Sequence, residues 1–345
     1  MRIPKGILSL LCIMLVFSVL LTACGGTSSK SSSTGKQENS SNKKVFVNIA
    51  TATTAGVYYA LGNSIAELWN KKISNVKASA QATAGTPQNI KLLAKKEAQV
   101  AFAQNGLALD AWEGRGVFAG KPEQGFRALT YLYPNVCYFV VRTDSGINSL
   151  ADIKGKRIAP GPVGSGTEGN AREILSVLDI DYKDKGDAKA QYVGNAEASE
   201  MFSNNQVDVT FIAGGIPHSS VVEMLTSTDA KILPITGEVR DMLIKKYPSY
   251  FPVTIPANTF KNQTQPVETV AVSNMLIGAA DLSDDVVYQM LDTMYKNTDQ
   301  LEKSFKGAGN MKPEEGINGI TVPLHPGAVK YFKEKGVQIP DKLLP

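Results

Sequence analysis

The chain has 345 residues, of which 43% are hydrophobic and 20% charged, and its formal net charge is +4 at pH 7. If an N-terminal leader carrying Arg2 and Lys5 is removed, the charge falls to about +2, too mild to indicate nucleic acid or a strongly anionic surface as the partner. Of the three cysteines, only Cys137 lies beyond the N-terminal segment, which excludes an intrachain disulfide in the folded body. The hydrophobic core must therefore supply the stability.

The N-terminal segment is typical of a secretory leader. Arg2 and Lys5 precede the apolar run Ile7–Leu21, whose 15 residues fall short of the roughly 20 that a membrane-spanning helix needs. The sequence Leu-Thr-Ala-Cys ends this run, and it resembles a bacterial lipoprotein signal. We therefore expect residues 1–23 to be cleaved and Cys24 to carry the lipid that anchors the chain to the outer face of the cell membrane. The alternative is an uncleaved membrane helix with an incidental cysteine.

Residues 24–44 continue as a tether. No apolar side chain occurs between Gly25 and Lys44, where serine, glycine, lysine and asparagine prevail. Such a composition is typical of a flexible linker. Beyond it, no hydrophobic run is long enough to span a bilayer, so any transport across the membrane requires a partner protein.

The remaining chain alternates between short apolar β-rich runs and helical patterns. The first series predicts strands over 45–50, 76–83 and 100–103, with helices over 56–71 and 86–96. Two long strands, 126–133 and 137–142, follow on either side of Pro134 and Asn135. The second series predicts strands over 157–160, 190–193, 207–213 and 231–235, and helices over 167–178, 196–202 and 219–225. Strands 251–260 and 269–277, a helix over 283–306 and a short helix from His325 complete the chain.

This order predicts an α/β fold with two lobes. Strand–helix–strand repeats favour parallel sheets covered by helices. Because the second series interrupts the first, we expect one lobe from 45–138 plus 255–345 and an inserted lobe from 139–254, joined by crossing strands. Ligands in such folds bind where loops leave the carboxyl ends of strands. The loops of the two lobes would then form the walls of one cleft.

Two loops of the first lobe are candidates for ligand binding. The first holds Thr53, Thr54, Tyr58 and Tyr59 at the start of a predicted helix, where free backbone N–H groups favour an anion. Simple helix capping with packed tyrosines is the alternative. The second loop holds Gln104 and Asn105, whose amides both donate and accept hydrogen bonds; a turn with Asn105 as a helix cap is the alternative.

Two loops of the second lobe are also candidates for ligand binding. Gly164, Gly166 and Gly169 spell a GxGxxG pattern, but the next strand ends in Gly194-Asn195 and offers no acidic residue for a ribose. We expect instead an anion-receptive helix start with Ser165, Gly166 and Thr167, in which Ser165 and Glu168 form a capping box. The last loop offers Gly214 and Gly215 for close backbone approach to a ligand. His218 follows as a surface or capping residue.

Catalytic and metal-binding patterns are sparse. The two histidines, His218 and His325, lack metal-ligand spacing, and no nucleophile elbow or phosphate-binding lysine motif occurs. We therefore expect no catalytic residues, no metal and no cofactor. The alternatives left open are a surface-tethered enzyme, either a hydrolase or a dehydrogenase that uses the glycine-rich loop, and an anchored ligand sensor.

Several segments together resemble one family, the TAXI-type solute-binding proteins of tripartite ATP-independent periplasmic (TRAP) transporters. They are the run Ile49–Trp69, the loops Gly155–Glu168 and Val207–Pro217, the return strands Ile255–Val272 and the C-terminal motif Leu324–Ala328. This resemblance covers nearly the whole chain from Val45. It implies a type II periplasmic-binding-protein fold and delivery of a captured ligand to an ion-driven permease.

The resemblance also implies the ligand class, a glutamate-like amino acid or a dicarboxylate. We then expect a monomeric binding protein for a small anionic or zwitterionic metabolite, with no nucleic acid as partner and the membrane reached through the lipid alone. Arg142 and Arg172 are candidates for an ionic anchor of the ligand. The residues expected to bind it are Thr53, Thr54, Tyr58, Tyr59, Gln104, Asn105, Ser165, Gly166, Thr167, Gly214 and Gly215.

Overall fold

Ten strands form one mixed sheet within residues 44–345, the part of the chain that the computed structural model describes. The expected leader, Cys24 and the tether as far as residue 43 lie outside the described residues. The main path of the sheet runs β2-β1-β3-β10-β4-β7-β5-β6, with β8 paired to β4 and β9 to β10. The strands are β1 (Val45–Ala50), β2 (Val76–Gln81), β3 (Val100–Gln104), β4 (Phe126–Arg142), β5 (Arg157–Ala159), β6 (Lys189–Ala190), β7 (Val209–Gly214), β8 (Ala230–Leu233), β9 (Phe251–Ile255) and β10 (Val267–Ala279).

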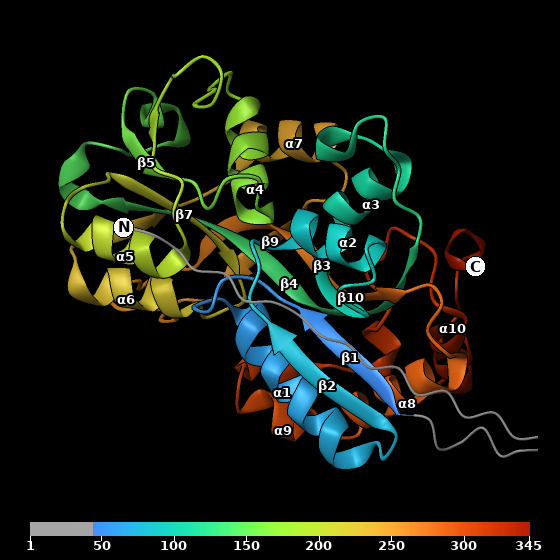
Figure 1. The fold of residues 1–345 in the computed structure, drawn as a ribbon. Helices are drawn as coiled ribbons and strands as arrows, with labels where there is room; N and C mark the ends of the chain where they lie inside the picture. Colours follow the sequence, from blue (N-terminus) through green and yellow to red (C-terminus); the bar gives the residue numbers. More distant parts are fainter. Residues whose placement is uncertain (1–43) are drawn as a thin grey trace, which may run out of the picture. The chain divides into compact units, whose positions relative to one another are not determined.

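Helices follow most of the strands, as the alternating pattern predicts. Figure 1 shows α1 beside β1 and β2, and α5 beside β7. The helices are α1 (Val57–Lys72), α2 (Thr86–Ala94), α3 (Asn105–Glu113), α4 (Gly166–Ser176), α5 (Asn195–Ser203), α6 (Ser219–Ser227), α7 (Gly237–Lys246), α8 (Asp284–Tyr295), α9 (Thr298–Glu302) and α10 (Pro326–Glu334).

Strand β1 pairs in parallel with β2 and β3, which confirms the parallel arrangement predicted for the first series. β1 and β3 are largely buried, because helices cover the sheet and apolar side chains fill the space between. On α1, buried Leu61, Ile65 and Trp69 recur at helical spacing and supply that packing.

Two long antiparallel strands, β4 and β10, run through the middle of the sheet (Figure 1). The hydrophobic core changes along them: Tyr133 and Met275 belong to one cluster of buried side chains, whereas Val136 and Val272 belong to two others. Both strands therefore connect two separately packed regions, one around β1–β3 and one around β5–β8.

Three details differ from the sequence predictions. β4 is a single strand, since Pro134 pairs with Ser273 of β10 close to a shift of register, where a missing N–H is tolerated. The helix predicted over 283–306 divides at Asn297 into α8 and α9, because Asn297 leaves the helical conformation with φ −136° and ψ 36°. Helices α3 and α7 were not predicted.

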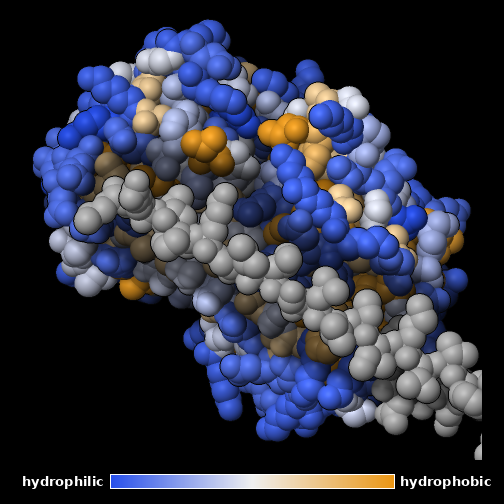
Figure 2. Space-filling view, viewed as in Figure 1, coloured by the Kyte–Doolittle hydropathy of each residue, from blue (hydrophilic) through white to orange (hydrophobic). Residues whose placement is uncertain are grey.

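The surface is mostly hydrophilic, and Figure 2 shows the apolar side chains of one face in small separate groups. The large apolar residues that are exposed, such as Phe46 and Val163, lie in different segments. No helix among residues 44–345 combines the length and apolarity needed to cross a membrane.

Candidate functional site

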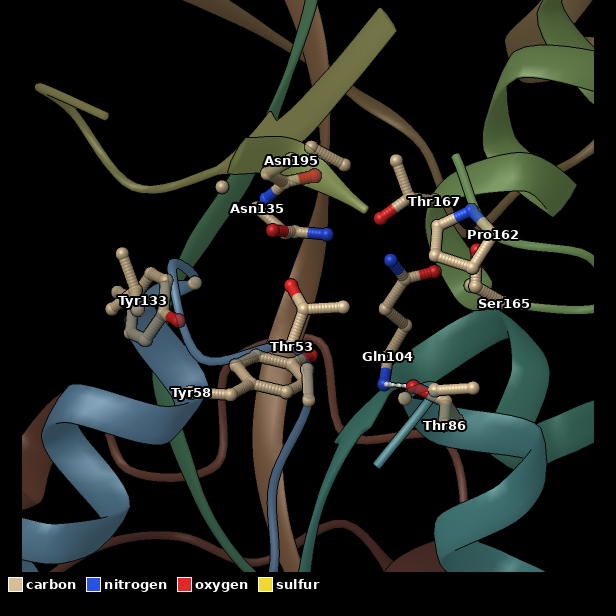
Figure 3. A pocket seen from close by; sticks show the side chains of 18 residues that line it. Thr53, Tyr58, Thr86, Gln104, Tyr133, Asn135, Pro162, Ser165, Thr167 and Asn195 are labelled. Atoms are coloured by element: carbon tan, nitrogen blue, oxygen red, sulfur yellow. Dashed lines mark hydrogen bonds between the residues drawn. The ribbon is translucent and has the colours of Figure 1, made fainter. Parts of the chain in front are cut away.

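Loops from both regions of the sheet line a cavity of about 50 Å³, which Figure 3 shows from close by. Strands β1, β2, β3 and β7 end at this cavity, and the middle of β4 forms part of its wall. It lies where ligands bind in α/β folds, at the carboxyl ends of strands. The lining residues are Ala52, Thr53, Gly56, Val57, Tyr58, Ala84, Gly85, Thr86, Gln104, Tyr133, Asn135, Pro162, Ser165, Gly166, Thr167, Asn195, Ala213 and Gly214.

Five helices start at this cavity. Val57 opens α1, Thr86 opens α2, Gly166 opens α4 and Asn195 opens α5, while Gln104 is the cap residue of α3. The first N–H groups of a helix have no partner within the helix, and the helix dipole makes that end partly positive. Several such ends around one space make an anion-binding site without any cationic side chain.

The lining itself is uncharged. Among residues 44–345, every side chain that lines the cavity is apolar, hydroxyl-bearing or an amide, and none is Asp, Glu, Lys, Arg or His. Figure 3 shows polar side chains from different elements directed into the space between them, namely those of Thr53, Gln104, Asn135 and Thr167. Hydroxyls and amides donate and accept hydrogen bonds, so the same set suits an oxyanion and a neighbouring ammonium or hydroxyl group.

Two buried polar atoms at the cavity have no hydrogen-bond partner among the described residues: Gln104 Oε1 and the hydroxyl of Tyr133. Both side chains are only 4% exposed. Burial raises the pKa of the Tyr133 hydroxyl well above its ordinary value, so this group stays protonated and can donate. Because unpartnered buried polar atoms are costly, these two groups need a partner that the protein itself does not supply.

The backbone of Gln104 is held in place by Thr86. The Gln104 N–H donates to Thr86 Oγ1 at 3.0 Å, a bond that links the starts of α2 and α3 (Figure 3). This hydrogen bond leaves the Gln104 side chain as the group presented to the cavity.

Tyr58 contributes its ring rather than its hydroxyl. The hydroxyl donates to Asn274 Oδ1 of β10, and the ring packs against Phe102 with centroids 4.7 Å apart. Burial raises the pKa of this hydroxyl, which keeps it in the donating form. Tyr58 therefore forms an apolar part of the wall.

The two walls approach each other closely. A methyl group on Gly166 would lie 3.1 Å from Gln104 Cδ, and one on Gly194 would lie 3.6 Å from Thr53 Cγ2. A methyl on Gly85, whose φ is +101°, would lie 3.9 Å from the Gly166 nitrogen. Glycine therefore allows backbone from one wall to contact the other.

Seven of the predicted ligand-binding residues line the cavity: Thr53, Tyr58, Gln104, Ser165, Gly166, Thr167 and Gly214. The structure places the other four elsewhere. Thr54 is exposed and Tyr59 half-buried, both outside the lining. Asn105 is buried and structural, because its amide accepts from Ser273 N at 3.2 Å and donates to Gly319 O at 3.1 Å. Gly215 packs instead against Phe305.

Sequence reasoning missed four polar lining residues, Thr86, Tyr133, Asn135 and Asn195. Thr86 follows a predicted strand and begins a predicted helix, a position from which it could have been identified as a site residue. Gly85 caps α2, and Thr86 is its first residue. Asn135 was interpreted as part of a strand break.

The candidate ionic anchors lie outside the lining. Arg142 pairs with Asp144 at 3.1 Å and donates to Phe202 O at 3.2 Å. The Arg172 guanidinium lies 3.7 Å from Glu168 Oε2. Neither cation therefore reaches the cavity.

The glycine-rich loop acts as a helix start. Ser165 Oγ accepts from the Glu168 N–H at 3.0 Å, which confirms Ser165 as the cap. The reciprocal half of the expected capping box is absent, because the Glu168 carboxylate accepts from Tyr182 at 3.0 Å instead. The loop therefore orders α4 and leaves its first N–H groups facing the cavity.

The histidines have structural positions. His218 caps α6 through Nδ1, which accepts from Ser220 N at 3.2 Å, but it is buried and not on the surface. His325 caps α10 in the same way through Gly327 N. No group of metal-binding side chains occurs within residues 44–345.

Three solved structures are similar to this chain. PhnD1 from Prochlorococcus marinus (MIT 9301), in complex with methylphosphonate, has 12% identity and a TM-score of 0.53 over 76% of this chain and 90% of its own. A protein from Bordetella bronchiseptica RB50 has 17% identity and a TM-score of 0.51 over 87% of this chain and 91% of its own. The alkanesulfonate-binding protein SsuA from Xanthomonas axonopodis pv. citri, bound to MOPS, has 18% identity and a TM-score of 0.49, with 84% of each chain covered.

The predicted fold class is confirmed: a type II periplasmic-binding-protein fold, with two α/β lobes joined by crossing strands. A cavity lined by helix starts at the carboxyl ends of strands completes this fold. The chain belongs to the NMT1-like family, which it matches over residues 49–336.

The family expected from the sequence motifs is corrected by these comparisons. The family model that matches residues 49–336 is that of the NMT1-like family and not of the TAXI type, so the expected TRAP permease was wrong as well. The motifs that carried the resemblance are mostly helix starts and strand ends, such as Gly164–Glu168. Capping chemistry dictates such segments, so they recur in binding proteins of different families.

Proposed function

We propose that this protein captures a small metabolite through a compact oxyanion group and passes it to a membrane permease. The observation that carries this proposal is the convergence of five helix starts on a cavity whose lining has no charged side chain. Helix N-termini hold carboxylates, phosphonates and sulfonates by the same chemistry, since each presents oxygen acceptors to N–H donors.

The polar side chains have complementary roles in this proposal. The starts of α4 and α2 approach each other across the cavity and would hold the oxyanion between them. The Tyr133 hydroxyl and the hydroxyl of Thr167 would donate further hydrogen bonds. Gln104 Oε1 is an acceptor without a partner, so it would receive a hydrogen bond from a hydroxyl or ammonium group elsewhere on the ligand.

The likeness to PhnD1 supports an oxyanion. That protein, which shares the fold, was solved with methylphosphonate bound. The proposed ligand class here is broader and includes carboxylates, because the cavity presents dipoles and no fixed cation.

Two further features belong to the proposal. We place the boundary between the lobes where the hydrophobic clusters change, between Tyr133 and Val136 on β4 and between Val272 and Met275 on β10. Lipid attachment at Cys24 would hold the folded body at the outer membrane face, with the tether to residue 44 giving it reach.

A thermal-shift screen of the purified protein tests the proposal. The panel contains carboxylates, amino acids, phosphonates and sulfonates, with neutral sugars as the control set, and the protein is first unfolded and refolded to remove any copurified ligand. A ligand at a hundredfold excess over its Kd adds about 2.7 kcal/mol to the free energy of unfolding, so the melting temperature rises by several degrees. If neutral sugars raise the melting temperature and oxyanions do not, the proposal is wrong.

A further inference from the structure

A second cavity of about 230 Å³ lies beside the first. Its walls come from β4, from the loop after β7 and from the segment that follows α9. Most of the lining is aromatic or aliphatic, including Tyr131, Tyr295, Phe305 and Met311. Charged and amide side chains, among them Lys312 and Glu315, complete the lining.

The two cavities adjoin each other at β4 and at the end of β7. Tyr133 is the residue that both linings share, and its neighbours divide between them: Asn135 lines the first cavity and Pro134 the second. The same division occurs after β7, where Gly214 lines the first cavity and Ile216 the second. Because β4 and β7 pair at Val136 and Gly214, both strands pass from one cavity to the other side by side.

The aromatic wall of the second cavity is well packed. The rings of Tyr133 and Phe305 pack with centroids 4.5 Å apart. Phe305 is enclosed by glycines, since a methyl group on Gly215 or Gly307 would lie 2.4 or 2.5 Å from its ring. Tyr133 thus lines both cavities, and its hydroxyl has no hydrogen-bond partner among the described residues.

We propose that the ligand is amphipathic: its oxyanion occupies the first cavity, and an aromatic or branched aliphatic group occupies the second, against Tyr133 and Phe305. This inference rests on the proposed function and narrows its ligand class. A compact dicarboxylate would leave the second cavity without a matching group, whereas an aryl or branched alkyl acid fills it with surface of the same polarity.

Isothermal titration of the whole protein with matched probes tests the inference. The compact probes are methylphosphonate and acetate; the tailed probes are benzylphosphonate and 3-phenylpropionate, which carry the same head groups. We expect each tailed probe to bind at least tenfold more tightly than its compact counterpart. Met311→Trp, which adds volume within the second cavity, should remove this advantage and leave the compact probes unaffected.

Two further variants make the result decisive. Met242→Trp is the matched control, because Met242 lies on α7 outside both linings, and it should keep the wild-type pattern. Asn310→Trp obstructs the same cavity from an exposed position and serves if Met311→Trp does not fold. Equal affinity for tailed and compact probes in the wild type would overturn the inference alone. The inference would also be overturned if the tailed probes still bind more tightly than the compact probes in every obstructing variant that folds. If no probe binds, the proposed function is overturned as well.

Discussion

Gly166, the first residue of α4, lies against the side chain of Gln104, the cap residue of α3: a methyl group on Gly166 would lie 3.1 Å from both Cδ and Nε2 of that amide. This contact joins the two walls of the cavity. We therefore expect Gly166→Ala to hold the walls apart by a few tenths of an ångström and to weaken ligand binding by about tenfold, or 1.4 kcal/mol. Titration of the ligand found in the screen measures the loss.

Gly169 supplies the matched control for that change. It lies on the same helix, and a methyl group there would meet nothing within 4 Å. Gly169→Ala should leave affinity unchanged and raise stability slightly, since alanine favours a helix by about 1 kcal/mol over glycine. Equal losses of affinity in both variants would mean that α4 as a whole is sensitive and that the contact with Gln104 is not the cause.

Ser165 and Thr167 are close in sequence but have different roles. Ser165 caps α4 through its hydroxyl, so Ser165→Ala should lower the free energy of unfolding by about 1 kcal/mol. The Thr167 side chain points into the cavity, so Thr167→Val, which keeps the shape, should lower affinity with little effect on stability. Urea unfolding and ligand titration of both variants separate the two effects; a stability loss in Thr167→Val would contradict the assignment.

The tyrosines of the cavity differ in the same way. Tyr133 has an unpartnered hydroxyl, so Tyr133→Phe should leave the stability of the free protein unchanged or higher and should reduce ligand affinity. Tyr58 donates to Asn274, so Tyr58→Phe leaves a buried acceptor without a partner and should cost about 1–3 kcal/mol of stability. Calorimetry on the free protein checks this contrast, and the opposite order would refute it.

Glu173 of α4 forms a buried polar cluster with Tyr250 and Asn170. The Tyr250 hydroxyl donates to Glu173 Oε2 at 2.5 Å and accepts from Asn170 Nδ2 at 2.7 Å. Burial raises the pKa of the Glu173 carboxyl to about 7, and the negative charge of Asp110 on α3 adds to this increase. The folded protein therefore favours the protonated carboxyl, whereas the unfolded chain titrates at about 4.3.

The sign of the pH effect follows from this increase. The contribution of Glu173 to stability is fully present below about pH 4 and is lost as the pH rises through 7, by an amount on the order of 3–4 kcal/mol. Glu173→Gln removes the titration and can keep the hydrogen bond from Tyr250. We expect wild type to lose stability relative to this variant between pH 5 and pH 8 in urea unfolding; parallel curves would exclude the effect. Burial lowers the pKa of His218 to about 4, but this titration is common to both proteins and cancels.

Much of the fold follows from local patterns in the sequence. The buried run Val100–Gln104 and the helical spacing of Leu61, Ile65 and Trp69 each depend on neighbouring residues alone, so alternation of strands and helices is visible in one sequence. Helix α3 was missed because its first residues are read equally well as a turn. Pro134 was read as a break because the bulge that accommodates it depends on β10, which is distant in sequence.

The sequence predicts the part of the candidate site that lies near strand ends. Thr53, Gln104 and Thr167 lie at the end of a strand or in the loop or helix start after one, and the structure brings them together. Tyr133 and Asn135 lie within a strand, where nothing local distinguishes an inward polar side chain from one that pairs in the sheet. Their exposure to the cavity depends on where β4 crosses between the two hydrophobic clusters, which only the assembled sheet defines.

The uncharged lining has a consequence for the medium in which the protein works. Dissolved salt screens interactions between charged side chains and a charged solute, with a Debye length of about 8 Å at 0.15 M. Helix dipoles and hydroxyls that line a cavity of about 50 Å³ act at hydrogen-bond contact, inside that distance, and without counterions to release. Capture should therefore depend little on ionic strength, so that a cell whose surroundings change from dilute to saline keeps nearly the same receptor.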